Sequence, residues 1–285
     1  MEYTYGLVPA TAFAGMICSG IIAVILPIVL MIVWKKKTSA KVSSFFIGCG
    51  TFVVFAFILE QIFHTVVLKL TGSAITGNIW LYALYGGICA GIFEETGRFV
   101  SMKFLMKNTL DKKNGIMYGI GHGGIEAILI VGISEVSNIA TGLAVNSGTI
   151  SAIINAVPDE TLRNQTYEQI SVLWTNPGNV FFAGGVERIS AIAFHICASY
   201  LVYKAVADKK ILNYVLAVAL HFALDAITVV INGQGCSIWI LEAIVFVFSA
   251  VCCYFVVRDY RSRKDASEAE QAEDIAANSE AVAEE

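Results

Sequence analysis

Seven long apolar runs dominate this sequence. A helix that crosses the hydrocarbon core of a bilayer needs about 20 consecutive apolar residues, and each run is long enough. The runs cover residues 7–34, 43–70, 80–103, 115–136, 181–204, 211–232 and 237–257. The composition agrees, because 56% of residues are hydrophobic and only 15% are charged, unlike an ordinary soluble domain. We expect residues 1–264 to form an all-α polytopic membrane helix bundle with about seven spans.

The basic residues predict how this bundle is oriented. Fifteen of the 19 lysines and arginines directly follow the first, third, fifth and seventh runs. Such segments stay on the cytoplasmic side, so we predict a multi-pass protein of the cell membrane with its N-terminus outside and its C-terminus in the cytoplasm. Residues 265–285 hold eight acidic residues and no aromatic one, which is typical of an acidic, disordered cytoplasmic tail.

The segment 137–180 is the ambiguous part of the topology. Residues 138–157 are uncharged and apolar enough to suggest an eighth span. A crossing here would invert every later loop and place seven basic residues outside, against the charge pattern. We therefore predict a re-entrant or interfacial segment on the outer side. It is expected to act either as a lid over a cavity or as a loop without a role.

Four of the predicted spans carry acids, histidines or arginines that lipid excludes. They are Glu94, Glu95 and Arg98 on one span, His122 and Glu126 on another, Glu187, Arg188 and His195 on a third, and His221 and Asp225 on a fourth. An ionisable side chain there costs roughly 3 kcal/mol or more unless it faces a polar interior and has partners. Four such spans predict one buried reaction centre.

Depth along the spans supports a single layer of polar groups. Counting from the nearest cytoplasmic lysine at about 1.5 Å per residue gives a depth of about 12–17 Å. The residues at this depth are Glu94, Glu95, His122, His195 and His221. Glycines four residues apart, as in Gly87 and Gly91, predict close helix packing that brings such side chains together. The same count places Glu60, His64, Glu187 and Arg188 in a separate outer cluster at about 26–35 Å, with Glu187 and Arg188 as a structural ion pair.

The adjacent carboxylates Glu94 and Glu95 suggest acid–base chemistry. Two carboxylates in a low-dielectric interior cannot both ionise cheaply, while Arg98, one turn from Glu94, favours charge on that residue. One carboxylate able to accept a proton near neutral pH is a general base. Neutral imidazoles from facing helices could bind a metal, orient a water or donate to an oxyanion, and Asp225 is spaced to orient His221.

At these residues the chain resembles the YhfC family of intramembrane metalloproteases. This family belongs to a wider group that includes the CAAX prenyl-proteases and PrsW-type site-1 proteases. The matching pieces are FEETGR at 93–98, GIGHGGIEA at 119–127, VERISAIAFH at 186–195 and HFALDA at 221–226. Together they span nearly half of the chain, and the set is specific although each piece alone is weak.

The resemblance implies an intramembrane endopeptidase that activates water to cut a peptide bond in or near the membrane. The implied catalytic set is Glu94, Glu95, Arg98, His122, Glu126, His195, His221 and Asp225, with His122, His195 and His221 as ligands of a divalent metal such as zinc. The expected partners are a membrane-embedded protein or peptide substrate and the lipid bilayer, but not nucleic acid. The substrate's identity stays open.

Two departures from the CAAX-type pattern limit the assignment. That pattern is EExxxR, whereas here Arg98 lies one turn from the first glutamate, so either Glu94 or Glu95 can be the base. Its FxxxH motif would need Phe at position 191, where this chain has Ala191. A metal-dependent and a glutamate-only mechanism are both consistent with these residue types.

The main alternative is a proton- or ion-coupled membrane transporter, because buried acids and histidines also form proton relays. A transporter of this kind predicts an internal repeat or paired interrupted helices, and no convincing repeat is found. A haem or quinone protein would need facing histidine pairs, which the predicted depths do not provide for His64. The protease interpretation is therefore the stronger one.

Overall fold

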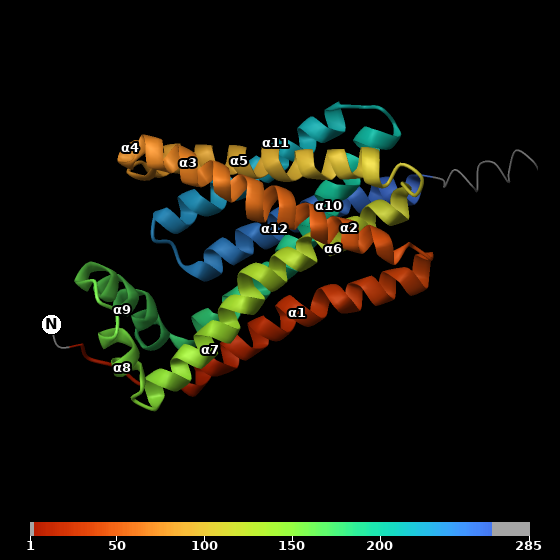
Figure 1. Ribbon diagram of the computed structural model, residues 1–285. Helices are drawn as coiled ribbons and strands as arrows, with labels where there is room; N and C mark the ends of the chain where they lie inside the picture. The colour runs from red at the N-terminus through yellow and green to blue at the C-terminus, as the bar shows by residue number, and fades with distance from the viewer. Residues whose placement is uncertain (1–2, 264–285) are drawn as a thin grey trace, which may run out of the picture.

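The computed structural model describes residues 3–263, and its regular structure is entirely helical there (Figure 1). Seven long helical segments make up the bundle in this part of the chain, as expected. They are α1 (Ala10–Thr38), α2–η1–α3 (Val42–Phe52, Val53–Glu60, Gln61–Thr71), α5–η2 (Ile79–Val100, Ser101–Leu105), α6–η3–α7 (Lys112–Ala127, Ile128–Gly132, Ile133–Asn146), η4–α10 (Gly178–Phe182, Ala183–Ala207), α11 (Leu212–Gly233) and α12 (Ile238–Ser262). Three short helices, α4 (Ser73–Thr76), α8 (Ile150–Asn155) and α9 (Glu160–Thr175), complete it. The predicted tail at 265–285 lies outside the described residues.

Six of these seven segments are long and apolar enough to cross a membrane. The exception within residues 3–263 is α5–η2, which carries Glu94, Glu95 and Arg98. Its 22 α-helical and 5 π-helical residues together extend about 40 Å, and α5 packs along α11 inside the bundle. The charges that lower its hydropathy are buried there, away from lipid.

The connections gather at two opposite ends of the bundle. The lysine-bearing connections α1–α2, α5–α6 and α10–α11 lie at the end where α12 finishes at Ser262 (Figure 1). We call this the basic end. The N-terminal segment, α4, α8, α9 and the α11–α12 connection lie at the opposite, distal end. This is the alternation that the loop charges predict.

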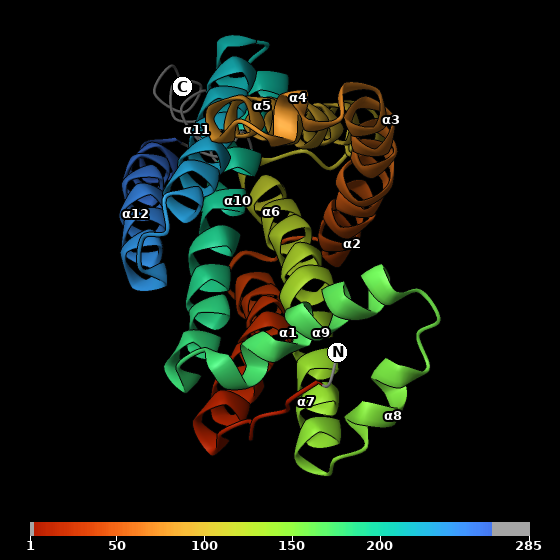
Figure 2. The same cartoon turned by 90° about the vertical axis from the view of Figure 1, so that its left-hand side faces the viewer.

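The segment 137–180 stays at the distal end and does not cross the bundle. Helix α7 continues α6 without a break to Asn146, about ten residues beyond the predicted end of that span. Polar residues of this extension are satisfied locally, since Asn138 donates to Glu135 Oε2 at 3.0 Å. Asn146 exchanges hydrogen bonds with the backbone of Val8 at 2.8 and 3.0 Å. Buried Ile150, Ile154 and Leu173 then pack α8 and α9 onto the N-terminal segment (Figure 2).

Glycines let the central helices approach closely. A Cβ built on Gly87 or Gly91 would lie 2.7 or 2.9 Å from a backbone oxygen of α11. A Cβ on Gly119 of α6 would lie 2.7 Å from Ile196 Cα of α10. The predicted small-residue faces are therefore real contact faces, and they bring the polar side chains of α5, α6, α10 and α11 together.

Three stretches of π-helix lie next to the polar residues. Segment η1 ends at Glu60, η2 begins three residues after Arg98, and η3 begins two residues after Glu126. A π-helical turn widens the helix and re-aims the side chains that follow it, and such turns are frequent at functional sites. In this fold they alter which side of each helix faces the bundle interior.

Candidate active site

Arg98 anchors the paired glutamates of α5. It is completely buried, and its two terminal nitrogens donate to Glu95 Oε1 and, at 3.3 Å, to Glu94 Oε2. Residues three and four positions apart lie on the same side of a helix, so one arginine reaches both acids. A planar guanidinium suits this arrangement because it presents several donors and stays charged. One positive charge from the same helix is therefore shared by the two acids.

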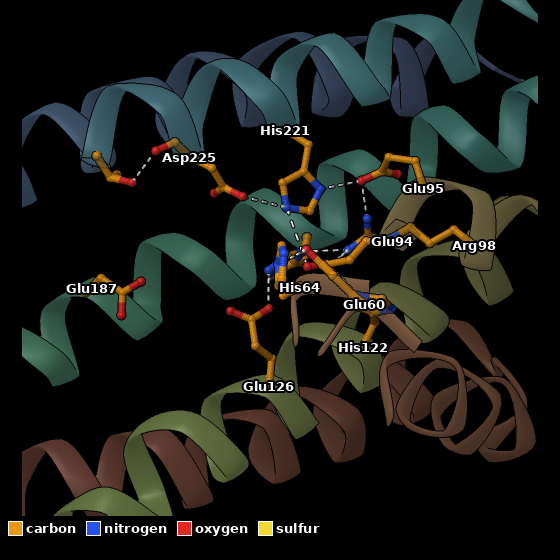
Figure 3. A network of polar contacts seen from close by, with 12 residues as sticks. Glu60, His64, Glu94, Glu95, Arg98, His122, Glu126, Glu187, His221 and Asp225 are labelled. Atoms are coloured by element: carbon orange, nitrogen blue, oxygen red, sulfur yellow. Dashed lines mark hydrogen bonds and ion pairs between the residues drawn. The ribbon is translucent and has the colours of Figure 1, made fainter. Parts of the chain in front are cut away.

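Three histidines from three other helices meet this cluster, two of them directly at the carboxylates. His122 Nε2 of α6 lies 2.8 Å from Glu94 Oε2. His221 of α11 places Nδ1 2.7 Å from Glu95 Oε1 and Nε2 3.7 Å from Glu94 Oε1 (Figure 3). The structure thus brings together residues that lie as far apart in the sequence as His221 and Glu95, which are separated by 126 positions.

His195 of α10 is held between an arginine and an acid. Its Nδ1 lies 2.6 Å from Arg98 Nη2 and 3.9 Å from Glu94 Oε2, while its Nε2 contacts Glu126 Oε2. An arginine nitrogen can only donate, so Nδ1 accepts and the proton sits on Nε2, directed at the carboxylate. The surrounding charges thus fix one neutral tautomer of this imidazole.

Glu126 extends the network toward the distal end. Its Oε1 accepts from Arg188 Nη1 at 2.8 Å, and Arg188 also donates to both oxygens of Glu187. The predicted ion pair between Glu187 and Arg188 is present. The predicted separation of an outer cluster is wrong, because Arg188 is joined through Glu126 to His195. Counting depth along straight spans ignores helix tilt and the reach of long side chains.

A cavity of about 610 Å³ opens along this network. Its lining includes Glu60, Glu94, Glu126, Glu187, Arg188, His195, His221, Asp225 and Glu242, with Phe52, Phe57, Phe194 and Leu224 among the apolar residues. Glu94 lines the cavity, whereas Glu95 is fully buried behind it. The described lining residues include none from 137–180, so that segment forms no lid over this cavity in the structure.

Asp225 faces the cavity one turn from His221. Its Oδ2 lies 3.7 Å from His221 Nε2, which is longer than a hydrogen bond. The close partner of that imidazole is instead Glu95, through Nδ1. Asp225 also keeps 35% of its side chain exposed, the most open of the acids in this network. It therefore has room to contact a bound molecule.

One group of side chains in residues 3–263 converges closely enough for a metal ion. Glu94, His195 and His221 each offer one ligand atom, and these atoms lie within 4.8 Å of one another. His122, expected as a ligand from the resemblance, lies against Glu94 Oε2, and its Nδ1 has no hydrogen-bond partner among the described residues. Glu94, and not His122, is therefore the third member of this group of possible ligands.

Sequence reasoning missed two parts of the cavity wall. Glu60 and Gln61 line it from the end of η1 and the start of α3, although Glu60 had been placed in a separate cluster. Glu242 of α12 lines it too and is 4% exposed. Glu242 has no other ionisable residue within one helical turn on either side. The only sequence signal for it was therefore an acid in an otherwise apolar run.

Comparison with known proteins decides the family. The family model described as YhfC intramembrane metalloprotease matches residues 22–245. The chain belongs to the YhfC family. Over 260 residues it is 38% identical to the uncharacterized membrane protein YhfC of Bacillus subtilis (strain 168), covering 90% of this chain and 99% of that protein. No solved structure matches the chain.

The family match confirms the resemblance that the four motifs carry. The region matched to the YhfC family includes the whole network from Glu60 to Glu242. The family's name points to a metal-dependent protease, and the convergence of Glu94, His195 and His221 is consistent with a bound ion.

Proposed function

We propose that this protein is an intramembrane endopeptidase whose active site is centred on Glu94. The observation that supports it most is the position of Glu94 on the cavity wall, within reach of His122, His195 and His221. Buried ionisable groups are costly in a membrane, and four helices contribute to this cluster. A cavity of this size between helices accommodates part of a membrane-embedded peptide.

The residues present fit a divalent metal ion. Two imidazoles and one carboxylate form the ligand set of many catalytic zinc sites, which leave a fourth position open. Ligands of a tetrahedral zinc lie roughly 3.4 Å apart, so the three side chains need to close in by about 1 Å. His195 Nδ1 would also exchange its hydrogen bond from Arg98 for the ion. Zinc held by Glu94, His195 and His221 would polarise the scissile carbonyl and a water molecule.

The chain's own residues supply the proton transfers. Glu94 has two oxygens, so one can serve as a ligand while the other accepts the proton of the attacking water. Water's oxygen then bonds to the carbonyl carbon, the peptide C–N bond breaks, and the proton passes to the leaving amine. Glu95 positions His221 and Arg98, and His122 positions Glu94, so these groups hold the reacting carboxylate in place.

The glutamate selected by this geometry is the first of the pair. Glu95 Oε1 is occupied by both Arg98 and His221, and the residue has no exposed surface. It is therefore a positioning residue in our proposal. We further propose the orientation that the basic loops predict, with the basic end in the cytoplasm and the N-terminus outside, and with an acidic tail on the cytoplasmic side.

Comparison of protein termini in living cells tests the function. Cells that produce the wild-type protein, the Glu94→Gln variant or the Glu135→Gln variant are compared for new protein termini by mass spectrometry. Glu135 is a buried acid of α7 that bonds to Asn138 outside the cavity, so its variant is a matched control. We expect termini in membrane proteins that are present with wild type and Glu135→Gln and absent with Glu94→Gln. Identical termini in all three strains would contradict the proposal.

A further inference from the structure

The distal half of the cavity lies well away from the proposed cleavage centre. Glu187 precedes His195 by eight residues on α10, which is about 12 Å along the helix. Glu242 is the fifth residue of α12, a helix that begins at the distal end (Figure 1). These residues would meet a substrate several positions from its scissile bond.

The cavity wall holds many more carboxyl groups than basic groups. Among the described residues that line it, six are carboxylates and one is an arginine. That arginine, Arg188, is already engaged by Glu187 and Glu126. Glu60 has one partner, His64 Nε2 at 3.2 Å. Among the described lining residues, no further arginine or lysine is therefore left to pair with Glu242.

Glu242 is the least satisfied of these acids. It is only 4% exposed, yet its Oε2 has no hydrogen-bond partner among the described residues. Leaving a buried acceptor unsatisfied costs free energy, and this cost is recovered if a ligand supplies the missing donor. Because Glu242 lines the cavity, the donor can come from a molecule bound there.

We propose that Glu242 forms a subsite for a basic side chain, lysine or arginine, of the substrate peptide. This inference rests on the proposed peptidase function and extends it to the substrate class. A long basic side chain carries several donors and a positive charge, which are the two features that the wall lacks.

The spacing of the acids favours a side chain over a second metal ion. Within residues 3–263, the one group of acids, histidines and cysteines that converges enough to hold an ion is Glu94, His195 and His221. The distance of about 12 Å along α10 corresponds to roughly three or four residues of extended peptide. We therefore expect the basic residue up to about four positions from the scissile bond.

Binding of a lysine-scanned peptide set tests the subsite without cleavage. The probes are fluorescent apolar peptides, long enough at about 20 residues to span a bilayer, that carry one lysine at successive positions, each with a norleucine twin. They are titrated onto full-length protein in lipid nanodiscs, in a Glu94→Gln background that blocks hydrolysis. We expect lysine to tighten binding about tenfold at one or two adjacent positions, the gain typical of one charge-assisted hydrogen bond.

Substitution of Glu242 links that gain to the subsite. Adding Glu242→Gln should remove most of the lysine preference while binding of the norleucine twin stays within about twofold, and Glu135→Gln should change neither. Glu242→Ala provides a second variant if Glu242→Gln does not yield folded protein. Equal binding of lysine and norleucine peptides at every position, or a preference that both variants retain, would overturn the subsite. If the subsite is present but wild type cleaves none of the peptides, the proposed function fails instead.

Discussion

The two halves of the cavity differ in how their carboxylates are paired. At the Glu94–Glu95 end, each acid contacts Arg98 and at least one imidazole. At the distal end, Glu242 has no hydrogen bond or ion pair to any described residue, and its Oε2 is buried without a partner. A cluster in which every acid has charged or imidazole partners holds its side chains in one arrangement, whereas an acid without any partner is poised to accept a ligand. Chemistry therefore belongs to the paired half in our proposal, and recognition to the distal half.

Removal of the Arg98 guanidinium is expected to cause the largest loss in the free energy of unfolding. Arg98→Met leaves two buried carboxylates without their cation, and losing one partner of a buried ion pair costs about 3–5 kcal/mol. We expect the free energy of unfolding, measured by detergent denaturation, to fall by about that amount. Adding Glu95→Gln to Arg98→Met should restore part of it. An Arg98→Met protein as stable as wild type would show that the pairing is not structural.

Metal content should separate ligands from positioning residues within the paired half. His221→Ala should lose a stoichiometrically bound divalent ion, while His122→Ala should retain it with about 10–100-fold weaker affinity, as for residues that support a ligand. The measurement is metal analysis of purified protein followed by titration with zinc. Equal metal loss in both variants would return His122 to the ligand set, and active wild type without metal would reject the ion altogether.

A change in the packing of α5 on α11 is expected to lower the free energy of unfolding less than Arg98→Met does and more than Glu242→Gln does. Gly91→Leu forces side-chain atoms toward the backbone oxygen of Val218, which would lie 2.9 Å from a Cβ added at Gly91. Overpacking of this kind costs about 1–3 kcal/mol and should reduce cleavage by moving Glu94 away from His221. Gly86→Ala is the matched control, since an added Cβ there meets no described atom within 4 Å. Similar losses in both variants would indicate a helix-wide effect.

The smallest stability effect is expected at the distal acid. Glu242→Gln replaces a carboxyl group whose Oε2 has no hydrogen-bond partner among the described residues. The free energy of unfolding should therefore stay within about 0.5 kcal/mol of wild type or rise slightly. The same denaturation assay used for Arg98→Met measures it. A loss near 3 kcal/mol, roughly that of a broken buried pair, would mean that Glu242 is a structural group, and the contrast between the two halves would disappear.

Three features were predictable from sequence: the helix content, the alternation of the loops between two ends, and the convergence of five polar side chains. These side chains are Glu94, Glu95, His122, His195 and His221. Apolar run length and lysine position carry that information directly, and residues at one depth on small-residue faces must meet. The position of Glu60 was not predictable in this way, because π-helical turns and helix tilt change which side chains share a cavity. Glu242 was missed because its neighbours in the cavity lie on other helices and leave no local pattern.

Choosing between Glu94 and Glu95 also required the structure. Their spacing to Arg98 allows either to contact it, since positions three and four apart are both neighbours on a helix. The packing of α11 favours Glu94 as the reacting group in our proposal, because it places His221 Nδ1 on Glu95 and leaves Glu94 on the cavity wall.

Hydrolysis in isotopically labelled water tests the central role of Glu94 most directly. Purified wild-type protein and its Glu94→Gln variant are incubated with the apolar peptide set in H₂¹⁸O, and products are analysed by mass spectrometry. We predict new C-terminal carboxylates carrying one ¹⁸O with wild type, and a rate at least about 10³-fold lower with Glu94→Gln. Equal cleavage by both proteins, or no cleavage by wild type of any peptide that it binds, would contradict this role.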